Sequence, residues 1–386
     1  AAIAAGMTIM ILSVATGIGL QQKIREKVMA FNGAVTLTRI ENQGQLEDFI
    51  PWHLSPENQQ KLSLMTGVAH AQPTAHKPSL ILTDQAFEGI VLKGVGPNYR
   101  WDYLSEFLVS GQWLSIDRIV SNGIVVSRLF ANRMNLKLGS RLNTYFFDEN
   151  NTKKFSPNAR ARGFQIVGLY DSGLEDFDQQ IAFVDLRHIQ RLNNWSSEEI
   201  GRLEVFPDSG VDVFKLTQNL YNAAPPDIDA VSMYQTFYNI FEWLTLFDFN
   251  IYLIIVIMVI VATINMVTAL IVLILERTRM IGLFQSMGAG NWRIQKIFLL
   301  QAVYIILWGL FWGNLIGLGT IFAQKTWALV SLDPQIYYVT EAPVYLPLFY
   351  WSLLNIGTLI LCLLFLLLPS HLIAKISPVS AMRFDR

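Results

Sequence analysis

The side chains best suited to metal binding or acid–base chemistry are five histidines, and their positions show no ligand spacing. They are His53, His70, His76, His188 and His371. The helical zinc pattern H-E-x-x-H does not occur, and neither does a G-x-S-x-G nucleophile elbow. A Walker A motif, G-x-x-x-x-G-K-[ST], is also missing. The sequence therefore predicts no catalytic site, no metal site and no cofactor in this chain.

Three long apolar runs carry no ionisable side chain. Residues 249–275, 298–322 and 344–368 contain no Asp, Glu, Lys, Arg or His. Each exceeds the roughly 20 residues that cross a bilayer core. Ion-coupled transporters usually need an ionisable group within the membrane. If the chain takes part in transport, we expect the energy to enter from outside these segments.

A fourth apolar run begins the chain. Residues 3–20 are uncharged but less apolar than the other three runs. No basic region precedes them and no clear A-x-A cleavage site follows, so we predict a transmembrane helix over 1–20 rather than a signal peptide. Because the sequence begins at Ala1 without a methionine, we expect that part of an N-terminal tail is missing.

Composition agrees with a membrane protein. Of the 386 residues, 52% are apolar and 15% are charged, against roughly 45–50% and about 25% in soluble domains. The loop 276–297 and the tail 369–386 are basic, whereas the loop 323–343 holds only Lys325. The positive-inside rule then places both termini in the cytoplasm. Residues 21–248 would lie outside the membrane, and their mildly acidic balance gives no indication of a nucleic-acid partner.

The long segment between the first two runs has the pattern of a folded domain. Short runs rich in Val, Ile, Phe and Tyr, bounded by Gly, Pro, Asn and Asp, predict strands at 34–40, 78–84, 87–96, 122–130, 140–147, 164–171, 180–186 and 201–207. Helical patterns occur at 21–33, 55–67, 184–194 and 212–223. We therefore predict an α-helical membrane protein with four transmembrane helices and a large α+β extracytoplasmic domain, 21–248, between the first and second.

A short basic segment, "ERTRMIGLFQSMGAGNWRIQKIF" (276–298), separates the second and third runs. Helical spacing places four apolar side chains on one face, namely Met280, Ile281, Phe284 and Met287. Gly288 and Gly290 are expected to break this helix. Such a helix can lie on lipid headgroups or in a groove of a partner protein, and its residue types leave both uses open.

The third run carries glycines at a spacing of four, Gly309, Gly313 and Gly317. This spacing puts them on one helix face, where they permit close approach of another helix. The second helix could belong to the same subunit or to a dimer partner.

Segment 276–302 closely resembles the region between the second and third spans of the MacB/FtsX/LolC-LolE class of ABC transporter permeases. The tail is similar to the closing "P-x-x-A-L-R" of that class, here Pro378, Ala381, Met382 and Arg383, with Met where Leu is usual. The resemblance implies a MacB-like permease fold, in which 276–297 holds a coupling helix docked on an ABC ATPase. The docking residues would be Glu276, Arg277, Arg279, Met280, Ile281, Phe284 and Met287.

Within the class, the chain is most similar to the lipoprotein-releasing LolC/LolE permeases. Its outer domain is larger than that of the FtsX type, and no ATPase is fused to it as in MacB. By this resemblance, 148–164 forms a hook-like hairpin that recruits a periplasmic LolA-like carrier through Phe155, Pro157, Arg160 and Arg162. From the residues alone, an ordinary solvated hairpin is an equal alternative.

The resemblance implies a non-catalytic subunit of the bacterial inner membrane. Two permeases, identical or paralogous, would pair with two ATPase subunits that bind ATP and Mg²⁺, and together they would extract lipoproteins from the membrane lipids. We expect Ile18, Leu20, Phe249, Tyr252 and Ile255 to line the lipoprotein cavity, with ordinary wall packing as the alternative. An FtsX-like regulator of a cell-wall hydrolase or sensor kinase, or a MacB-like efflux permease, remains a competing interpretation.

Overall fold

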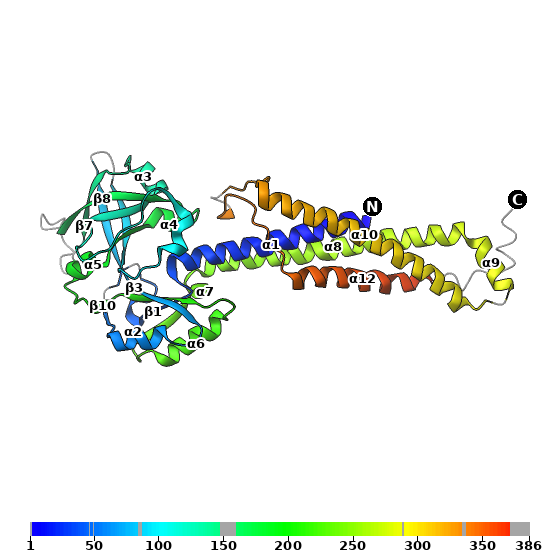
Figure 1. The fold of residues 1–386 in the computed structure, drawn as a ribbon, viewed down its shortest axis with the longest axis horizontal. Helices are drawn as coiled ribbons and strands as arrows, with labels where there is room; N and C mark the ends of the chain where they lie inside the picture. The colour runs from blue at the N-terminus through cyan, green and yellow to red at the C-terminus, as the bar shows by residue number, and fades with distance from the viewer. Residues whose placement is uncertain are drawn as a thin grey trace. The chain divides into compact units, whose positions relative to one another are not determined.

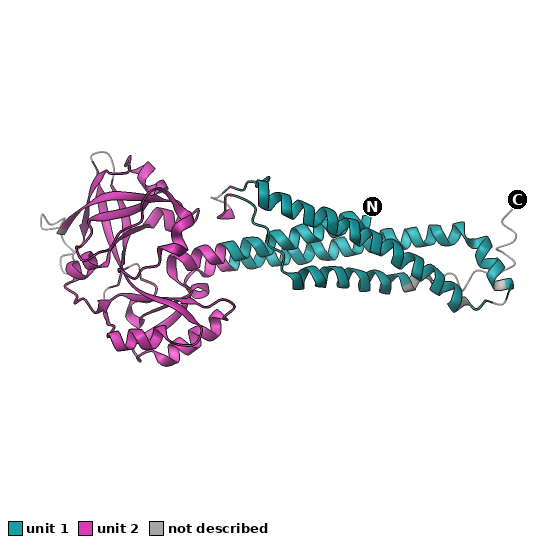
Figure 2. Cartoon of the chain, viewed as in Figure 1, with its two compact units in different colours: residues 1–23, 242–332, 341–386 teal, residues 24–241, 333–340 magenta. Residues whose placement is uncertain are grey.

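The computed structural model describes residues 2–45, 47–48, 50–83, 87–146, 160–287, 289–333 and 337–370 (Figure 1). The chain forms two compact units (Figure 2). Unit 1 comprises Ala1–Lys23, Glu242–Leu332 and Glu341–Arg386, and unit 2 comprises Ile24–Phe241 and Asp333–Thr340. The described residues contain four candidate membrane helices, with a large α+β domain between the first and second. The predicted fold class is confirmed.

Four helices are long and apolar enough to cross a membrane: α1 (Ala2–Asn32), α8 (Tyr238–Glu276), α10 (Asn291–Trp327) and α12 (Leu348–Ser370). A short helix, α9 (Thr278–Ser286), connects α8 to α10. α1 and α8 both extend beyond their charge-free runs, and each continues without a break from unit 1 into unit 2.

Two helix ends follow from single residues. α1 ends at Asn32 because Gly33 takes a left-handed conformation (φ 71°) that favours glycine. The predicted stop at Gly33 is confirmed. The apolar run that starts at residue 344 becomes helical only from Leu348. Pro347 has no N–H to donate and is best placed at the start of a helix, so the first four residues of that run stay outside it.

Unit 2 is built on a ten-stranded, mainly antiparallel sheet. Its order is β12-β1-β11-β3-β4-β9-β6-β8-β5, with β7 paired to β3 and β8; only β4–β9 and β6–β8 are parallel. The strands are β1 (Val35–Arg39), β3 (Val68–Leu82), β4 (Phe87–Val95), β5 (Leu108–Gly111), β6 (Gly123–Ser127), β7 (Arg141–Phe146), β8 (Arg160–Tyr170), β9 (Ile181–Asp185), β11 (Arg202–Pro207) and β12 (Ile228–Ser232). A separate pair joins β2 (Trp52–His53) and β10 (Glu199–Ile200).

Helices cover this sheet. They are α2 (Pro56–Ser63), α3 (Arg128–Arg133), α4 (Glu175–Gln180), α5 (Leu186–Asn193), α6 (Val213–Ala223) and α7 (Met233–Thr236), with short 3-10 turns at Ile40–Asn42 and Trp101–Phe107. The predicted helices at 55–67, 184–194 and 212–223 correspond to α2, α5 and α6. Ser55 caps α2, since its side chain accepts a hydrogen bond from the Asn58 backbone N–H.

Each of the eight predicted strand segments overlaps an observed strand, but β2, β5, β10, β12 and the first half of β3 were not predicted. Residues 68–77 read "VAHAQPTAHK", in which Pro73 and two histidines hide the strand pattern. They nevertheless pair with β11 over Val68–Thr74. The extended conformation of this segment is set by its pairing with β11, which is distant in sequence, and the local sequence does not reveal such pairing.

Candidate functional site

The predicted coupling segment contains a short helix of its own, between the two neighbouring membrane helices. α8 ends at Glu276, α9 covers Thr278–Ser286, and α10 starts after Gly290. The Ala289 backbone N–H donates to the Phe284 carbonyl (2.9 Å) and closes the end of α9. Gly290 has φ −63°, so its role is to cap α10 and not to adopt a left-handed turn. Gly288 lies outside the described residues.

Some apolar side chains of α9 pack inside the chain, and others are exposed. Ile281 is fully buried, and Met280 and Phe284 pack against the same core of unit 1. Ile281 cannot contact a docked partner without leaving this core, so its predicted docking role is replaced by internal packing. The exposed apolar side chains are Met287 (76%) and Leu283 (59%).

Sequence reasoning missed Leu283 as an exposed apolar residue. Its helical spacing from Met280 and from Met287 is the signal that could have placed it on the same face. Glu276, Arg277 and Arg279 are exposed as expected for residues that could meet a partner.

The glycine face of α10 packs against α1. A Cβ atom at Gly313 would lie 2.6 Å from the Met7 Cβ and 2.9 Å from the Ala4 carbonyl oxygen. Gly309 and Gly317 face Ile3 and Ile11 in the same way. Thr8 adds a hydrogen bond from its hydroxyl to the Gly313 carbonyl (3.1 Å). The close partner of the three glycines is thus a helix of the same subunit.

The five residues predicted to line a lipoprotein cavity do not share one environment. Leu20 is buried, and Ile18 and Ile255 are half-buried against the core of unit 1. Only Phe249 and Tyr252, one turn apart on α8, are well exposed. Leu20 is therefore explained by packing within the chain. Of the five predicted residues, Phe249 and Tyr252 are the two that can contact lipid or cargo.

Besides Thr8, polar side chains link the described membrane helices at two further places. Asn314 on α10 and Asn355 on α12 exchange hydrogen bonds (2.6 and 3.2 Å), and the Trp351 indole N–H donates to the Asn314 side-chain oxygen (2.6 Å). At the other place the Gln21 amide donates to the Asp248 carboxylate (2.6 Å), which joins α1 to α8. These groups satisfy one another in an apolar setting, as structural hydrogen bonds do.

The base of the predicted hook is a β-hairpin. β7 and β8 pair antiparallel, from Arg141 opposite Gln165 to Phe146 opposite Arg160. Arg162 lies on β8 opposite Thr144, and its side chain is exposed. The expected tip, with Phe155 and Pro157, lies outside the described residues, as does the side chain of Arg160.

Four of the five histidines belong to the part of the chain that the structure describes, and His371 lies outside it. Among the described residues, no group of three or more His, Cys, Asp or Glu side chains is arranged to hold a metal ion. The His188 ring nitrogen Nε2 lies 2.9 Å from the Ser121 carbonyl oxygen, and burial lowers the pKa of this histidine.

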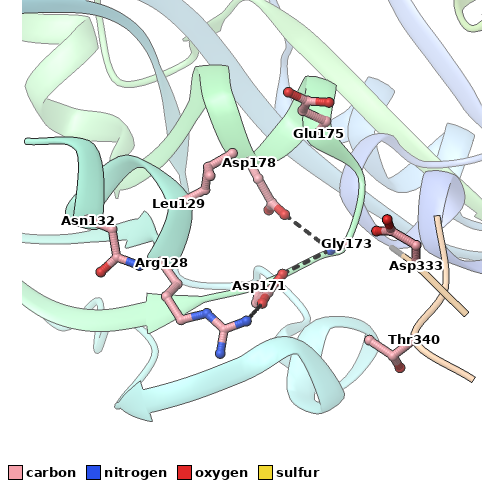
Figure 3. Close-up of a pocket in the computed structure, with 9 residues that line it drawn as sticks. All are labelled: Arg128, Leu129, Asn132, Asp171, Gly173, Glu175, Asp178, Asp333 and Thr340. Atoms are coloured by element: carbon pink, nitrogen blue, oxygen red, sulfur yellow. Dashed lines mark hydrogen bonds and ion pairs between the residues drawn. The ribbon is translucent and has the colours of Figure 1, made fainter. Parts of the chain in front are cut away.

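Unit 2 contains a cavity of about 340 Å³ with several charged residues in its lining (Figure 3). It is lined by Arg128, Leu129, Asn132, Asp171, Gly173, Glu175, Asp178, Asp333 and Thr340. Arg128 forms an ion pair with Asp171. Asp178 is buried and accepts hydrogen bonds from the Ser172 backbone N–H, the Ser172 hydroxyl and the Gly173 backbone N–H (3.0, 2.8 and 3.1 Å).

Asp178 should make the chain less stable as the pH rises from about 4 to about 6. Burial raises the pKa of its carboxyl group to about 6 and outweighs the hydrogen bonds from Ser172 and Gly173. The folded carboxyl group binds its proton more tightly than the unfolded one. Its contribution is therefore full below about pH 4, and about 2–3 kcal/mol is lost by about pH 6.

Urea unfolding of the detergent-solubilised chain at several pH values checks this expectation. Asp178→Asn should remove the slope between pH 4 and 6 that the wild type shows. Parallel curves for the two proteins would mean that Asp178 titrates as an ordinary carboxyl group.

Comparison with known proteins identifies the class. Residues 252–378 match the family described as "FtsX-like permease C-terminal", a stretch that includes the second span, α9 and the third span. Over the whole chain, the sequence is 21% identical to the lipoprotein-releasing system transmembrane protein LolC of Neisseria meningitidis serogroup B, across 93% of that protein. These matches support an ABC transporter permease of the LolC/MacB/FtsX class.

Other relatives of this permease give similar values. It is 20% identical to LolC of Xylella fastidiosa (strain 9a5c), over 99% of this chain and 92% of that protein. The periplasmic region of MacB from Actinobacillus actinomycetemcomitans aligns with 52% of the permease and 88% of that structure, at 15% identity and a TM-score of 0.36. A likeness of that size carries no argument by itself.

Similarity to this class has three implications. It supports an inner-membrane protein with a periplasmic domain, it implies an ABC transporter with an ATPase partner, and it favours a transmembrane type of subunit. The resemblance predicted from 276–302 and from the tail is thereby confirmed at the level of the class.

Proposed function

We propose that this permease is the membrane subunit of an ATP-driven transporter that extracts lipoproteins from the bacterial inner membrane and passes them to a periplasmic LolA-like carrier. The observation that carries the proposal is the similarity to proteins named LolC, which extends over 100% of this chain and so includes the outer domain. The match to the FtsX-like family covers only residues 252–378. It does not distinguish lipoprotein release from regulation of a partner enzyme or from efflux, which are the other functions expected in this class.

The proposed mechanism is mechanical transmission. Two copies of an ABC ATPase, which bind ATP and Mg²⁺, dock on the coupling segments of two permeases, identical or paralogous. Both termini of the chain lie in the cytoplasm, on the side of α9. Movement of α9 is passed to α8 and α10, and the unbroken helices α1 and α8 carry it to the residues of unit 2.

Cargo and carrier would use the remaining candidate residues. Acyl chains enter from the lipid beside α8, where Phe249 and Tyr252 are exposed. The β7–β8 hairpin, with Arg162 exposed at its base, then meets the carrier. In this proposal Ile18 and Ile255 support the wall of the path instead of contacting cargo.

Purification of the detergent-solubilised chain from its native membrane, followed by mass spectrometry, tests the function. We expect an ATPase subunit together with triacylated lipoprotein or a soluble lipoprotein carrier. An ATPase accompanied by a cell-wall hydrolase or a sensor kinase would replace the proposal with an FtsX-like regulator. An ATPase accompanied by a periplasmic adaptor would replace it with a MacB-like efflux permease.

The coupling segment offers a sharper prediction. Leu283→Glu combined with Met287→Glu should reduce the amount of co-purified ATPase by roughly tenfold or more, because it would place unpaired charges in an apolar docking groove. Leu283→Met combined with Met287→Leu keeps apolar side chains of similar size at both exposed positions and serves as the control. ATPase recovery that is the same for both proteins would exclude this face of α9 as the docking surface.

A further inference from the structure

A buried lysine lies where α1 ends. Lys93 belongs to β4, a central strand of the sheet, and its side chain is only 1% exposed. Its ammonium nitrogen lies 2.5 Å from the Glu204 Oε1 atom on β11. The same nitrogen donates a hydrogen bond to the carbonyl oxygen of Phe31, in the last turn of α1. One side chain therefore contacts two strands and a helix.

The partners of Lys93 are themselves fixed. The Glu204 carboxylate, also 1% exposed, accepts hydrogen bonds from the Gln72 amide (3.1 Å) and the Thr74 hydroxyl (3.4 Å), both on β3. The ammonium group also faces the rings of Tyr99 and Phe183, 5.7 and 5.9 Å from their centroids. The charge pair is thus held from several sides, which is what a buried ion pair needs to offset its loss of hydration.

The position of the lysine has a physical reason. The last four carbonyl groups of a helix have no donor within the helix, and that end carries partial negative charge. A cation usually reaches it from the same helix or from solvent. Here the donor comes from β4, so the bond to Phe31 joins α1 to the sheet as well as satisfying its end.

Aromatic packing and backbone bonds meet at the same place. The Phe31 ring lies 5.4, 5.6 and 5.2 Å from the rings of Phe107, Tyr170 and Phe177. Three residues after Phe31, the Ala34 N–H donates to the Val205 carbonyl of β11, and the Ala34 carbonyl accepts from the Met233 N–H (both 2.9 Å). Met233 opens α7, immediately before α8.

We infer that Lys93 locks the last turn of α1 to β4 and β11, so that the end of the helix and the sheet move as one rigid body. The bonds of Ala34 bring the start of α7 to the same joint. The use of this joint to transmit force rests on the proposed function, whereas the joint itself does not.

Hydrogen exchange of the full chain in detergent micelles, read at single amides by fragmentation mass spectrometry, tests the inference. The variant is Lys93→Met combined with Glu204→Met, which removes both charges together and leaves an apolar pair of similar size. Such exchanges are commonly tolerated by the fold. The backbone amides of Gly33, Ala34 and Met233 should exchange roughly tenfold faster or more, as expected for the loss of one charge-assisted hydrogen bond.

A second ion pair of unit 2 provides the matched control. The Lys77 ammonium lies 2.5 Å from the Glu47 carboxylate, and its bond does not involve α1. Lys77→Met combined with Glu47→Met should leave the three amides at their wild-type rates. Wild-type rates in the Lys93 and Glu204 variant, or an equal increase in the control, would overturn the inference.

A measurement on the wild type keeps the test decisive if the double variant does not fold. If the end of α1 and the sheet move as one body, the amides of Gly33 and Ala34 should exchange as slowly as the amide of Val205 on β11, once each is corrected for its intrinsic exchange rate. Markedly faster exchange at Gly33 and Ala34 than at Val205 would also overturn the inference. The measurement needs neither nucleotide nor partner, so it remains valid if the proposed transport function fails.

Discussion

Replacing Lys93 alone by methionine should lower the free energy of unfolding of the chain by about 3–5 kcal/mol. The Glu204 carboxylate would then stay buried without its counter-charge, and the Phe31 carbonyl would lose its donor. Urea unfolding of the detergent-solubilised chain, followed by tryptophan fluorescence, measures the change. Trp101 and Trp113 stack on each other beside Phe183, one of the rings that faces Lys93, so their emission should report on this core.

Comparison with the double variant separates the cost of an unpaired buried charge from the cost of replacing the side chains. Lys93→Met with Glu204→Met should recover most of the lost stability, because no unpaired charge remains. If the single and double variants unfold at the same urea concentration, the carboxylate is not what makes the single change costly.

Gly313→Leu should destabilise the helix bundle by about 3 kcal/mol or more, as overpacking does where neighbours cannot move. The first side-chain atom would already lie 2.6 Å from the Met7 Cβ and 2.9 Å from backbone of α1. Only separation of α1 from α10 relieves this contact. A thermal unfolding series in detergent, monitored by loss of the monodisperse peak on size exclusion, measures the effect.

The same helix supplies the control. A Cβ atom at Gly319 would meet nothing within 4 Å among the described atoms. Gly319→Leu should leave the unfolding temperature unchanged or slightly raise it, because leucine favours a helix more than glycine does. Equal losses for the two variants would show that the bundle tolerates neither change for reasons other than the contact with α1.

Sequence reasoning located elements well where one residue decides the outcome. Gly33 ends α1, and the absence of charge marks the membrane helices. The start of α12 was predicted less well. The apolar run from residue 344 predicts a membrane segment, but the helix begins only after Pro347.

The candidate sites were harder to predict because periodicity identifies a face but not its partner. The glycine spacing on α10 was recognised, yet only the fold shows that α1 lies against it. The face of α9 was recognised too, but Ile281 packs inward and Leu283 points outward. The pair of Lys93 and Glu204 joins residues far apart in sequence, and no local pattern announces it.

The glycine contact between α1 and α10 also constrains how the protein is made. The bond from Thr8 to Gly313 joins residues 305 positions apart. α1 leaves the ribosome before the outer domain, whereas its packing partner α10 is synthesised only after it. During translation α1 must therefore stay in the bilayer through its own hydropathy, while the outer domain folds on the far side of the membrane. Closure of the bundle is a late assembly step, completed only when α10 has been inserted.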